Sequence, residues 1–178
     1  MPHRPSKKYE EMRETLTREC DGAGELIAYL EDHTDWLTSP ASLRYHGSYI
    51  GGLIDHSAKV ADAALRLAPV VEDMMGKKLE GRVALVGLFH DVGKVGMYER
   101  GSSKSRVWYY NEKMVAMPHS VRSLHVISRF VPLTVVEWQA IYAHNGQYVE
   151  HNKEVAMKEE PLTLLLHMAD MWSARFGV

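Results

Sequence analysis

The sequence predicts an all-α protein, a helical bundle that carries a small β-hairpin insertion. Most segments of the chain repeat apolar residues every three or four positions, the spacing that places them on one face of a helix. Turn-forming stretches with Gly, Pro or Ser separate these segments. One stretch, residues 98–114, instead combines turn residues with aromatic and β-branched ones, a composition that favours strand.

The N-terminal quarter is expected to form two helices. Residues 7–20 have the polar pattern of a surface helix, and residues 23–37 place apolar side chains at helical spacing. Pro40, flanked by serines, predicts a loop after them. A length of 178 residues fits one domain. We therefore interpret residues 1–178 as a single domain in which residues 1–24 form an N-terminal helix or extension.

The longest helical pattern covers residues 48–70 and contains two adjacent glycines, Gly51 and Gly52. Each glycine inside a helix costs about 1 kcal/mol, so their presence indicates close approach by a neighbouring segment or a ligand. Thr134 and Glu137 have the spacing of a capping box and predict a helix start. Four further helices are expected, at 80–93, 118–131, 134–146 and 160–176.

The strand-favouring stretch predicts a small hairpin or flap. The turn-like sequence RGSSKS precedes Val107, Trp108, Tyr109 and Tyr110. These aromatic rings could stack on a nucleotide base, or they could simply pack the hairpin. As isolated aromatics they favour the packed hairpin.

Composition excludes several classes of protein. With 46% hydrophobic and 25% charged residues the chain resembles an ordinary soluble domain, and a net charge of −2 gives no footprint for direct nucleic-acid binding. No apolar run approaches the roughly 20 residues that span a bilayer, and the polar start is not a secretory signal. Cys20 is the only cysteine, so no internal disulfide is expected. These points predict a cytoplasmic protein, and Trp172 and Phe176 near the end suggest a homo-oligomer interface.

One short stretch, VALVGLFHDVGK at residues 83–94, carries chemistry as well as structure. It begins like a buried helix and then sets His90 beside Asp91, with Lys94 three residues further on. Burying such groups without partners costs several kcal/mol as an order of magnitude. A bound metal ion is one candidate partner.

Further imidazoles and a carboxylate lie within or at the ends of other predicted helices. They are separated by about one helix and one connection each, so they could converge inside the bundle. Nitrogen and oxygen donors without thiolates suit Zn, Mn, Fe, Co or Ni. Two ions about 3.5–4 Å apart would use all the ligands if a carboxylate bridged them, and Asp91 is the natural bridge. The six candidate ligands are His56, His90, Asp91, His119, His144 and Asp170.

Each candidate also has an ordinary structural explanation. A single histidine on a helix is more often a packed residue than a ligand, whereas the adjacent His–Asp pair is much stronger evidence. Asp170, flanked by apolar residues, could form a salt bridge to Arg175. His167 lies one helical turn before Asp170 and could orient it, although packing is favoured.

The ordered set resembles the HD superfamily of metal-dependent phosphohydrolases. HDVGK is very close to that superfamily's His-Asp-hydrophobic-Gly-Lys signature, and RYHGSYIGGLIDHSAKV and LLLHMADMWSA resemble its first and last ligand segments. The similarity runs from about residue 25 to the C-terminus. It is greatest to small stand-alone bacterial or phage HD domains, which include phage-type dATP triphosphohydrolases. The resemblance implies an all-α HD-domain bundle.

The resemblance also implies roles for individual residues. Lys94 matches a lysine that contacts substrate phosphate. His46 resembles a position near the phosphate pocket, where it could donate a proton to the leaving group; a turn histidine is the alternative. Asp91 would fix the attacking hydroxide or accept its proton. One or two divalent transition-metal ions are implied, the first held by His56, His90, Asp91 and Asp170 and the second with His119 and His144.

The activity implied is hydrolysis of a nucleotide, foremost a deoxynucleoside (tri)phosphate, by a metal-activated water that attacks phosphorus. The expected partner is therefore a small-molecule nucleotide. Two other readings stay open: an HD-fold di-iron oxygenase, and a nucleotide-binding module without catalysis. Lys94 does not separate the hydrolase from the oxygenase, while the intact ligand set argues against a non-catalytic module.

Overall fold

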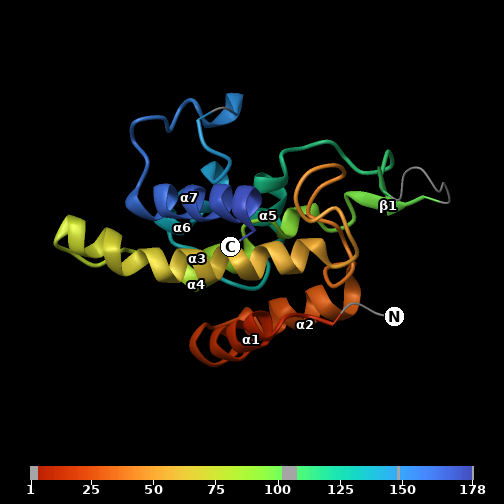
Figure 1. Cartoon of the computed structure of the whole chain (residues 1–178), viewed down its shortest axis with the longest axis horizontal. Coiled ribbons are helices and arrows are strands. Elements are labelled where there is room, and N and C mark those ends of the chain that lie inside the picture. Colours follow the sequence, from red (N-terminus) through yellow and green to blue (C-terminus); the bar gives the residue numbers. More distant parts are fainter. Residues whose placement is uncertain (1–3, 102–107, 148, 178) are drawn as a thin grey trace.

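The structure is a computed structural model that describes residues 4–101, 108–147 and 149–177. Within these residues it contains seven α-helices and one antiparallel two-stranded hairpin, which confirms the predicted fold class (Figure 1). The strands are β1 (Tyr98–Arg100) and β2 (Trp108–Tyr110); Val107 and the predicted turn lie largely outside the described residues. The helices are α1 (Lys7–Glu19), α2 (Ala23–His33), α3 (Gly52–Met75), α4 (Val83–Phe89), α5 (His119–Ile127), α6 (Val135–Ala143) and α7 (Pro161–Phe176).

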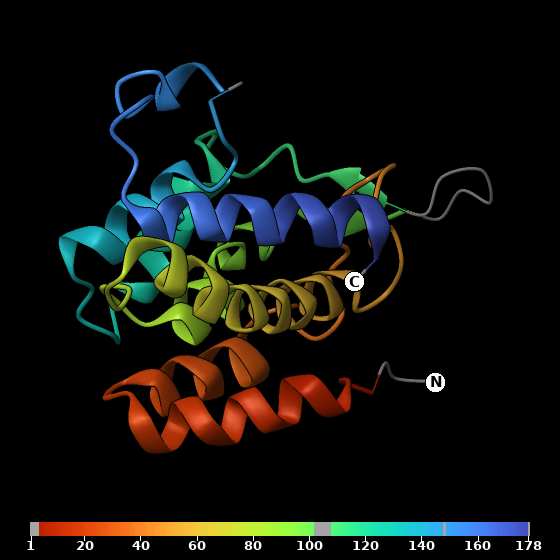
Figure 2. The same cartoon turned by 60° about the vertical axis from the view of Figure 1, so that its left-hand side comes forward.

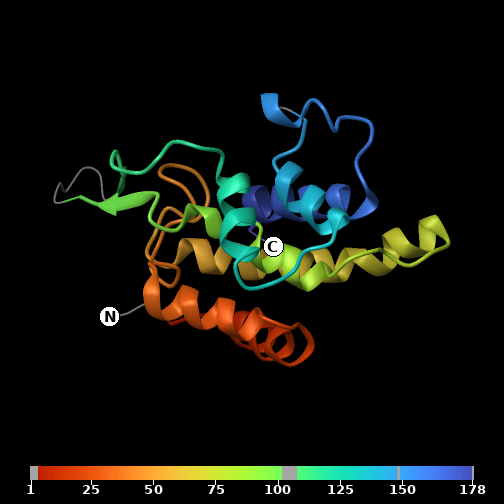
Figure 3. The same cartoon turned by 180° about the vertical axis from the view of Figure 1, so that it is seen from behind.

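Helix α3 lies at the centre of the bundle. It packs against α4 and α7, and Figures 1 and 2 show α7 running alongside it on one side. Helices α1 and α2 form a separate layer on the opposite side, where they share the apolar core with α3 and α4. Helices α5 and α6 follow one another beside α7, as the view from behind shows (Figure 3). The single-domain assignment for residues 1–178 stays a prediction.

The start of α3 differs from the sequence prediction. The helix begins at Gly52 and ends at Met75, so Gly51 is its N-cap, Gly52 is its first residue, and neither glycine interrupts it. Gly51 adopts a left-handed conformation, with φ of 80°, that glycine tolerates best. A Cβ on Gly52 would lie 1.9 Å from the carbonyl oxygen of Gly47. The predicted close approach is therefore confirmed, and the neighbour is the loop before the helix.

Helix α4 is shorter than predicted. It ends at Phe89, and a 3₁₀ turn at Val92–Lys94 follows after His90 and Asp91. A Cβ on Gly93 would lie 2.0 Å from the carbonyl oxygen of His119, so this glycine lets the start of α5 pack directly on the turn. Gly93 thus allows the start of α5 to lie next to the His90–Asp91 pair.

The predicted capping box at α6 is confirmed. The Thr134 hydroxyl accepts from the Glu137 backbone N–H, and the Glu137 carboxylate accepts from the Thr134 backbone N–H. Glu137 is fully buried, and its carboxylate also pairs with Arg82 at 2.7 Å. The cap therefore ties α6 to the segment that leads into α4.

Replacing Thr134 with alanine should lower the free energy of unfolding by about 1 kcal/mol, because the helix loses a side-chain acceptor at its first turn. Thr15→Ala is the matched control, since that hydroxyl only bonds back to the Glu11 carbonyl within α1. Urea denaturation of both variants measures the difference. Equal stabilities for the two variants would contradict the proposed contribution of the cap.

No helix within residues 4–101, 108–147 and 149–177 is both long and apolar enough to cross a membrane. Trp172 and Phe176 are partly exposed on α7, so they are available for an interface. Whether the protein forms a homo-oligomer stays a prediction.

Candidate metal centre

The six predicted ligands meet in one cluster inside the bundle. His56 projects from the first turns of α3, and Asp170 comes from the middle of α7. His90 and His144 are the C-terminal caps of α4 and α6, and Asp91 precedes the 3₁₀ turn. His119 is the first residue of α5. Helix ends therefore supply four of the six groups, which lets polar side chains converge without interrupting the apolar faces of the helices.

Asp91 lies at the centre of the cluster, and its two carboxylate oxygens face different histidines. Oδ2 lies 3.7 Å from Nε2 of His56 and 3.5 Å from Nε2 of His90. Oδ1 lies 3.3 Å from Nε2 of His119 and 3.5 Å from Nε2 of His144. This division is the arrangement expected of a carboxylate placed between two cation sites.

Asp170 completes the side of the cluster that contains His56. Its Oδ1 lies 3.0 Å from Nε2 of His56 and 3.9 Å from Nε2 of His90. Among the described residues, the Asp170 carboxylate forms its ion pairs with His56 and His90. The alternative salt bridge to Arg175, itself a described residue, is not formed. Burial alone would raise the pKa of Asp170, but the close approach of His56 and of the other neighbouring imidazoles holds it below its usual range.

The donor atoms of the cluster fit a divalent metal ion. The Nδ1 atoms of His90 and His144 lie 2.8 and 2.7 Å from the carbonyl oxygens of Gly87 and Ile141. Because a carbonyl can only accept, these contacts assign the proton to Nδ1 and leave the lone pair on Nε2, facing the cluster. The Nε2 atoms of His56 and His90 and Oδ1 of Asp91 are buried without a hydrogen-bond partner among the described residues. A bound cation would accept the lone pairs of these buried atoms.

Lys94 contacts the cluster from the cavity side. Its Nζ lies 2.6 Å from Oδ2 of Asp91, and its side chain is 13% exposed. Burial opposes the charged form of both groups, but their attraction dominates: it holds the pKa of Asp91 well below its usual range and raises the pKa of Lys94. Lys94 is therefore a charged group beside the candidate metal site, and its contact with substrate phosphate stays a prediction.

His46 lies against His56, with ring centroids 4.5 Å apart. Its Nε2 is buried without a hydrogen-bond partner in the described part of the chain. Burial, followed by repulsion from His56 and Lys94, lowers the pKa of His46 to about 4. The imidazole is therefore neutral at pH 7, so the predicted role as proton donor requires a bound anion to raise its pKa.

A cavity of about 520 Å³ opens beside the cluster. It lies between the loop before α3 and the β-hairpin, which run next to each other in Figure 1. Trp108 is buried, as the packed hairpin predicts, whereas Tyr110 is exposed and lines the cavity; stacking of these rings on a base stays a prediction. The lining residues are Ala41, Ser42, Leu43, Arg44, Tyr45, His46, Lys94, Met97, Tyr98, Tyr110 and His119.

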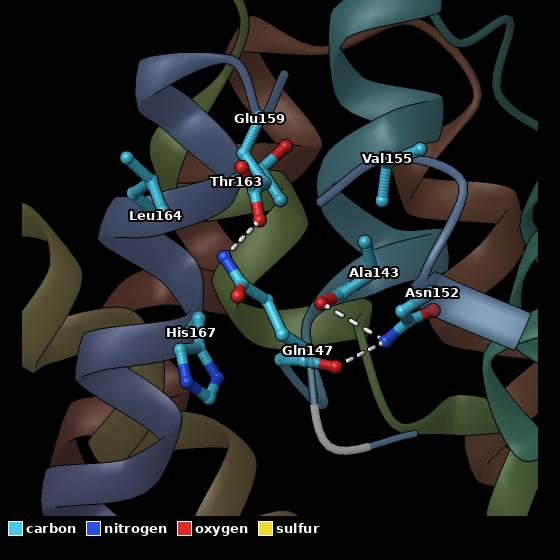
Figure 4. Close-up of a pocket in the computed structure, with 9 residues that line it drawn as sticks. Ala143, Gln147, Asn152, Val155, Glu159, Thr163, Leu164 and His167 are labelled. Atoms are coloured by element: carbon cyan, nitrogen blue, oxygen red, sulfur yellow. Dashed lines mark hydrogen bonds between the residues drawn. The ribbon is translucent and has the colours of Figure 1, made fainter. Parts of the chain in front are cut away.

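A second cavity, of about 420 Å³, lies between α6, α7 and their connection (Figure 4). His167 lines it, and its Nδ1 lies 2.7 Å from the carbonyl oxygen of His144. The predicted options for His167 were orienting Asp170 or packing; the structure instead connects it to the backbone of another candidate ligand. Gln147 and Glu159 bond across the same cavity at 2.8 Å.

Sequence reasoning missed two kinds of residue at the centre. Ser173 lies 3.4 Å from Nδ1 of His56 and can fix that ring; its position one turn after Asp170 was the available signal. Arg44 and Tyr45 line the cavity of about 520 Å³ beside the cluster, called the main cavity below. They lie in a loop, where no apolar periodicity could indicate that their side chains face a cavity.

No model of a known protein family matches the chain, and no solved structure matches it. Among curated proteins, the chain is similar to the dihydroneopterin 2′,3′-cyclic phosphate phosphodiesterase of Methanocaldococcus jannaschii, with 29% identity over 111 residues. The match covers 62% of this chain and 43% of the relative, so it spans less than half of that protein's length.

Two metal ions per chain are expected, because the oxygens of Asp91 face two separate sets of histidines. Elemental analysis after saturation with Mn should give about two equivalents, and His119→Ala should reduce this to about one while the site at His56 keeps its ion. His125→Ala, on the exposed part of α5, is the control. One equivalent in the unmodified protein, unchanged by His119→Ala, would leave His119 and His144 with a structural role only.

Proposed function

We propose that this protein is a metal-dependent phosphohydrolase that acts on a nucleotide. The observation that carries the proposal is the position of Asp91: its carboxylate lies between two sets of histidines and contacts Lys94, which borders the main cavity. The similarity to a phosphodiesterase supports the same reaction class, hydrolysis at phosphorus.

The residues of the cluster divide the work of such a reaction. A divalent ion bound there would act as a Lewis acid on a phosphoryl oxygen and lower the pKa of a water molecule toward about 7. Asp91, whose pKa is held low, is better suited to orienting that water than to accepting its proton. The flexible stem of Lys94 allows its ammonium to turn from Asp91 toward a phosphate, where it offsets negative charge in the transition state.

Two substrate classes have specific support. The likeness of HDVGK and its flanking ligand segments to phage-type dATP triphosphohydrolases favours a deoxynucleoside triphosphate. The name of the curated relative favours a 2′,3′-cyclic phosphodiester. Both place a phosphate group and a planar heterocyclic ring in one molecule, and both would set phosphorus near Lys94.

A panel of substrates tests the proposal and separates these classes. The full chain is incubated with deoxynucleoside triphosphates, ribonucleoside triphosphates and monophosphates, and nucleoside 2′,3′-cyclic phosphates, each with Mn, Co, Ni, Zn or Fe(II). Release of phosphate or triphosphate, or opening of the cyclic ester, is followed by chromatography, and oxygen uptake is recorded in parallel. Hydrolysis that Asp91→Asn abolishes is expected. Metal-dependent oxygen consumption without hydrolysis would replace the proposal with the di-iron oxygenase reading.

A further inference from the structure

Two exposed tyrosines from different segments of the chain line the main cavity. Tyr45 belongs to the loop before α3 and is 84% exposed, and Tyr110 belongs to β2 and is 62% exposed. Tyr110 is backed by Tyr98, its cross-strand partner, with ring centroids 5.4 Å apart and Tyr98 almost fully buried. Exposed aromatic rings lose water contact only when something covers them, so these two faces are available to a flat ligand.

The same cavity has a polar inner end. Lys94 and His119 line it with side chains that are only 13% and 24% exposed, and both contact Asp91. The cavity therefore has two different ends: buried polar groups line the inner end, and exposed tyrosines line the outer end. A phosphate belongs at the inner end and the remainder of the substrate at the outer end.

The outer lining offers little that could read the edge of a base. Ala41, Leu43 and Met97 are apolar, and the Ser42 hydroxyl already bonds to the His46 carbonyl and the Tyr45 amide. The remaining polar groups beside the two tyrosines are His46, next to the metal cluster, and Tyr98, which is almost fully buried. Arg44 and Lys94 are cations, and the lining residues described include no carboxylate and no carboxamide. A pocket of this composition attracts an anion with an aromatic ring, and it provides few acceptors for base-specific hydrogen bonds.

We propose that Tyr45 and Tyr110 hold the planar heterocycle of the substrate by stacking, so that the protein selects a ring-bearing phosphate with little preference for the identity of the ring. This inference rests on the proposed function, because it takes the substrate phosphate to lie at Lys94. Stacking is tolerant of sequence because every base has a π-face. Purines should bind more tightly than pyrimidines, since they offer a larger face, while adenine and guanine should bind about equally.

Binding to the metal-saturated full chain tests this without any turnover. The ligands are the phosphonate analogues of AMP, GMP, UMP and ribose 5-phosphate, whose P–C bond is not hydrolysed, and the method is isothermal titration calorimetry. The adenosine analogue should bind at least about fivefold more tightly than the ribose analogue, the lower end of the range for stacking of one base on an aromatic side chain. Tyr110→Leu should remove most of this difference, and Tyr110→Phe, which keeps the ring, should retain it.

The outcomes are distinct. Equal binding of the ribose and adenosine analogues, or an unchanged ratio in Tyr110→Leu with a folded circular dichroism spectrum, overturns the stacking proposal. Tenfold or greater discrimination between adenine and guanine overturns the proposed tolerance. If the stacking pattern appears but no phosphoester in the substrate panel is hydrolysed, the assignment of the cavity stands and the proposed hydrolytic function fails.

Discussion

Asp91→Asn is expected to reduce hydrolysis by about a thousandfold or more, equivalent to about 4 kcal/mol in the barrier. The substitution keeps the shape of the side chain but removes the charge that faces both sets of histidines. A neutral amide is a weak ligand for a divalent cation, so bound metal should fall in parallel with activity. Elemental analysis and steady-state kinetics on the same preparation measure the two effects together.

The free energy of unfolding of Asp91→Asn, measured without metal, provides a second test. Asp91 is 1% exposed and carries the only ion pair that the structure gives for Lys94 among the described residues. Loss of the Asp91 charge leaves a largely buried ammonium without its ion-pair partner, which is strongly destabilising. Asp32→Asn, an exposed acid on α2, is the matched control for charge. Full metal content and activity in Asp91→Asn would show that the site has been assigned to the wrong residues.

The candidate site could be predicted from the sequence because its residues follow a local rule. His90 and Asp91 end an apolar run, and His144 ends another, so each polar group stands out against the pattern beside it. Four of the six groups lie at helix ends, and His56 and Asp170 lie on the inner faces of α3 and α7, so residues far apart in the sequence converge. Sequence alone could not show which oxygen of Asp91 faces which histidine, since that depends on how α5 sits against the turn at Gly93.

The errors in the predicted helices also have physical causes. Apolar periodicity continues through Ile50 and across the glycines, but Gly51 adopts a left-handed conformation, with φ of 80°, that a regular helix cannot contain. Likewise the apolar pattern of α4 continues to Val92, although the backbone leaves the helical region at Asp91, with φ of −107° and ψ of 6°. In both places the backbone conformation of one residue, Gly51 or Asp91, sets the boundary, and apolar periodicity carries no information about it.

Lys94→Ala is expected to lower kcat/KM at least tenfold, a loss of about 1.4 kcal/mol or more in stabilisation of the transition state. The reason is the loss of a positive charge next to the phosphoryl group that the cavity would hold. Lys94→Arg should recover part of the rate because it restores charge at a longer reach. Lys113→Ala, an exposed lysine after the hairpin, controls for the change in net charge.

The metal affinity of Lys94→Ala separates a role in catalysis from a role in folding, because Lys94 pairs with Asp91. The ammonium competes with a cation for Oδ2 of Asp91, from which it lies 2.6 Å away. Its removal should therefore leave metal affinity unchanged or increase it, even as turnover falls. A lysine that only stabilised the end of a helix would contribute about 0.3–1 kcal/mol to folding and nothing to catalysis. Near-normal turnover in Lys94→Ala together with a lowered melting temperature would assign Lys94 that structural role, and the proposed phosphohydrolase would lose the group that binds its phosphate.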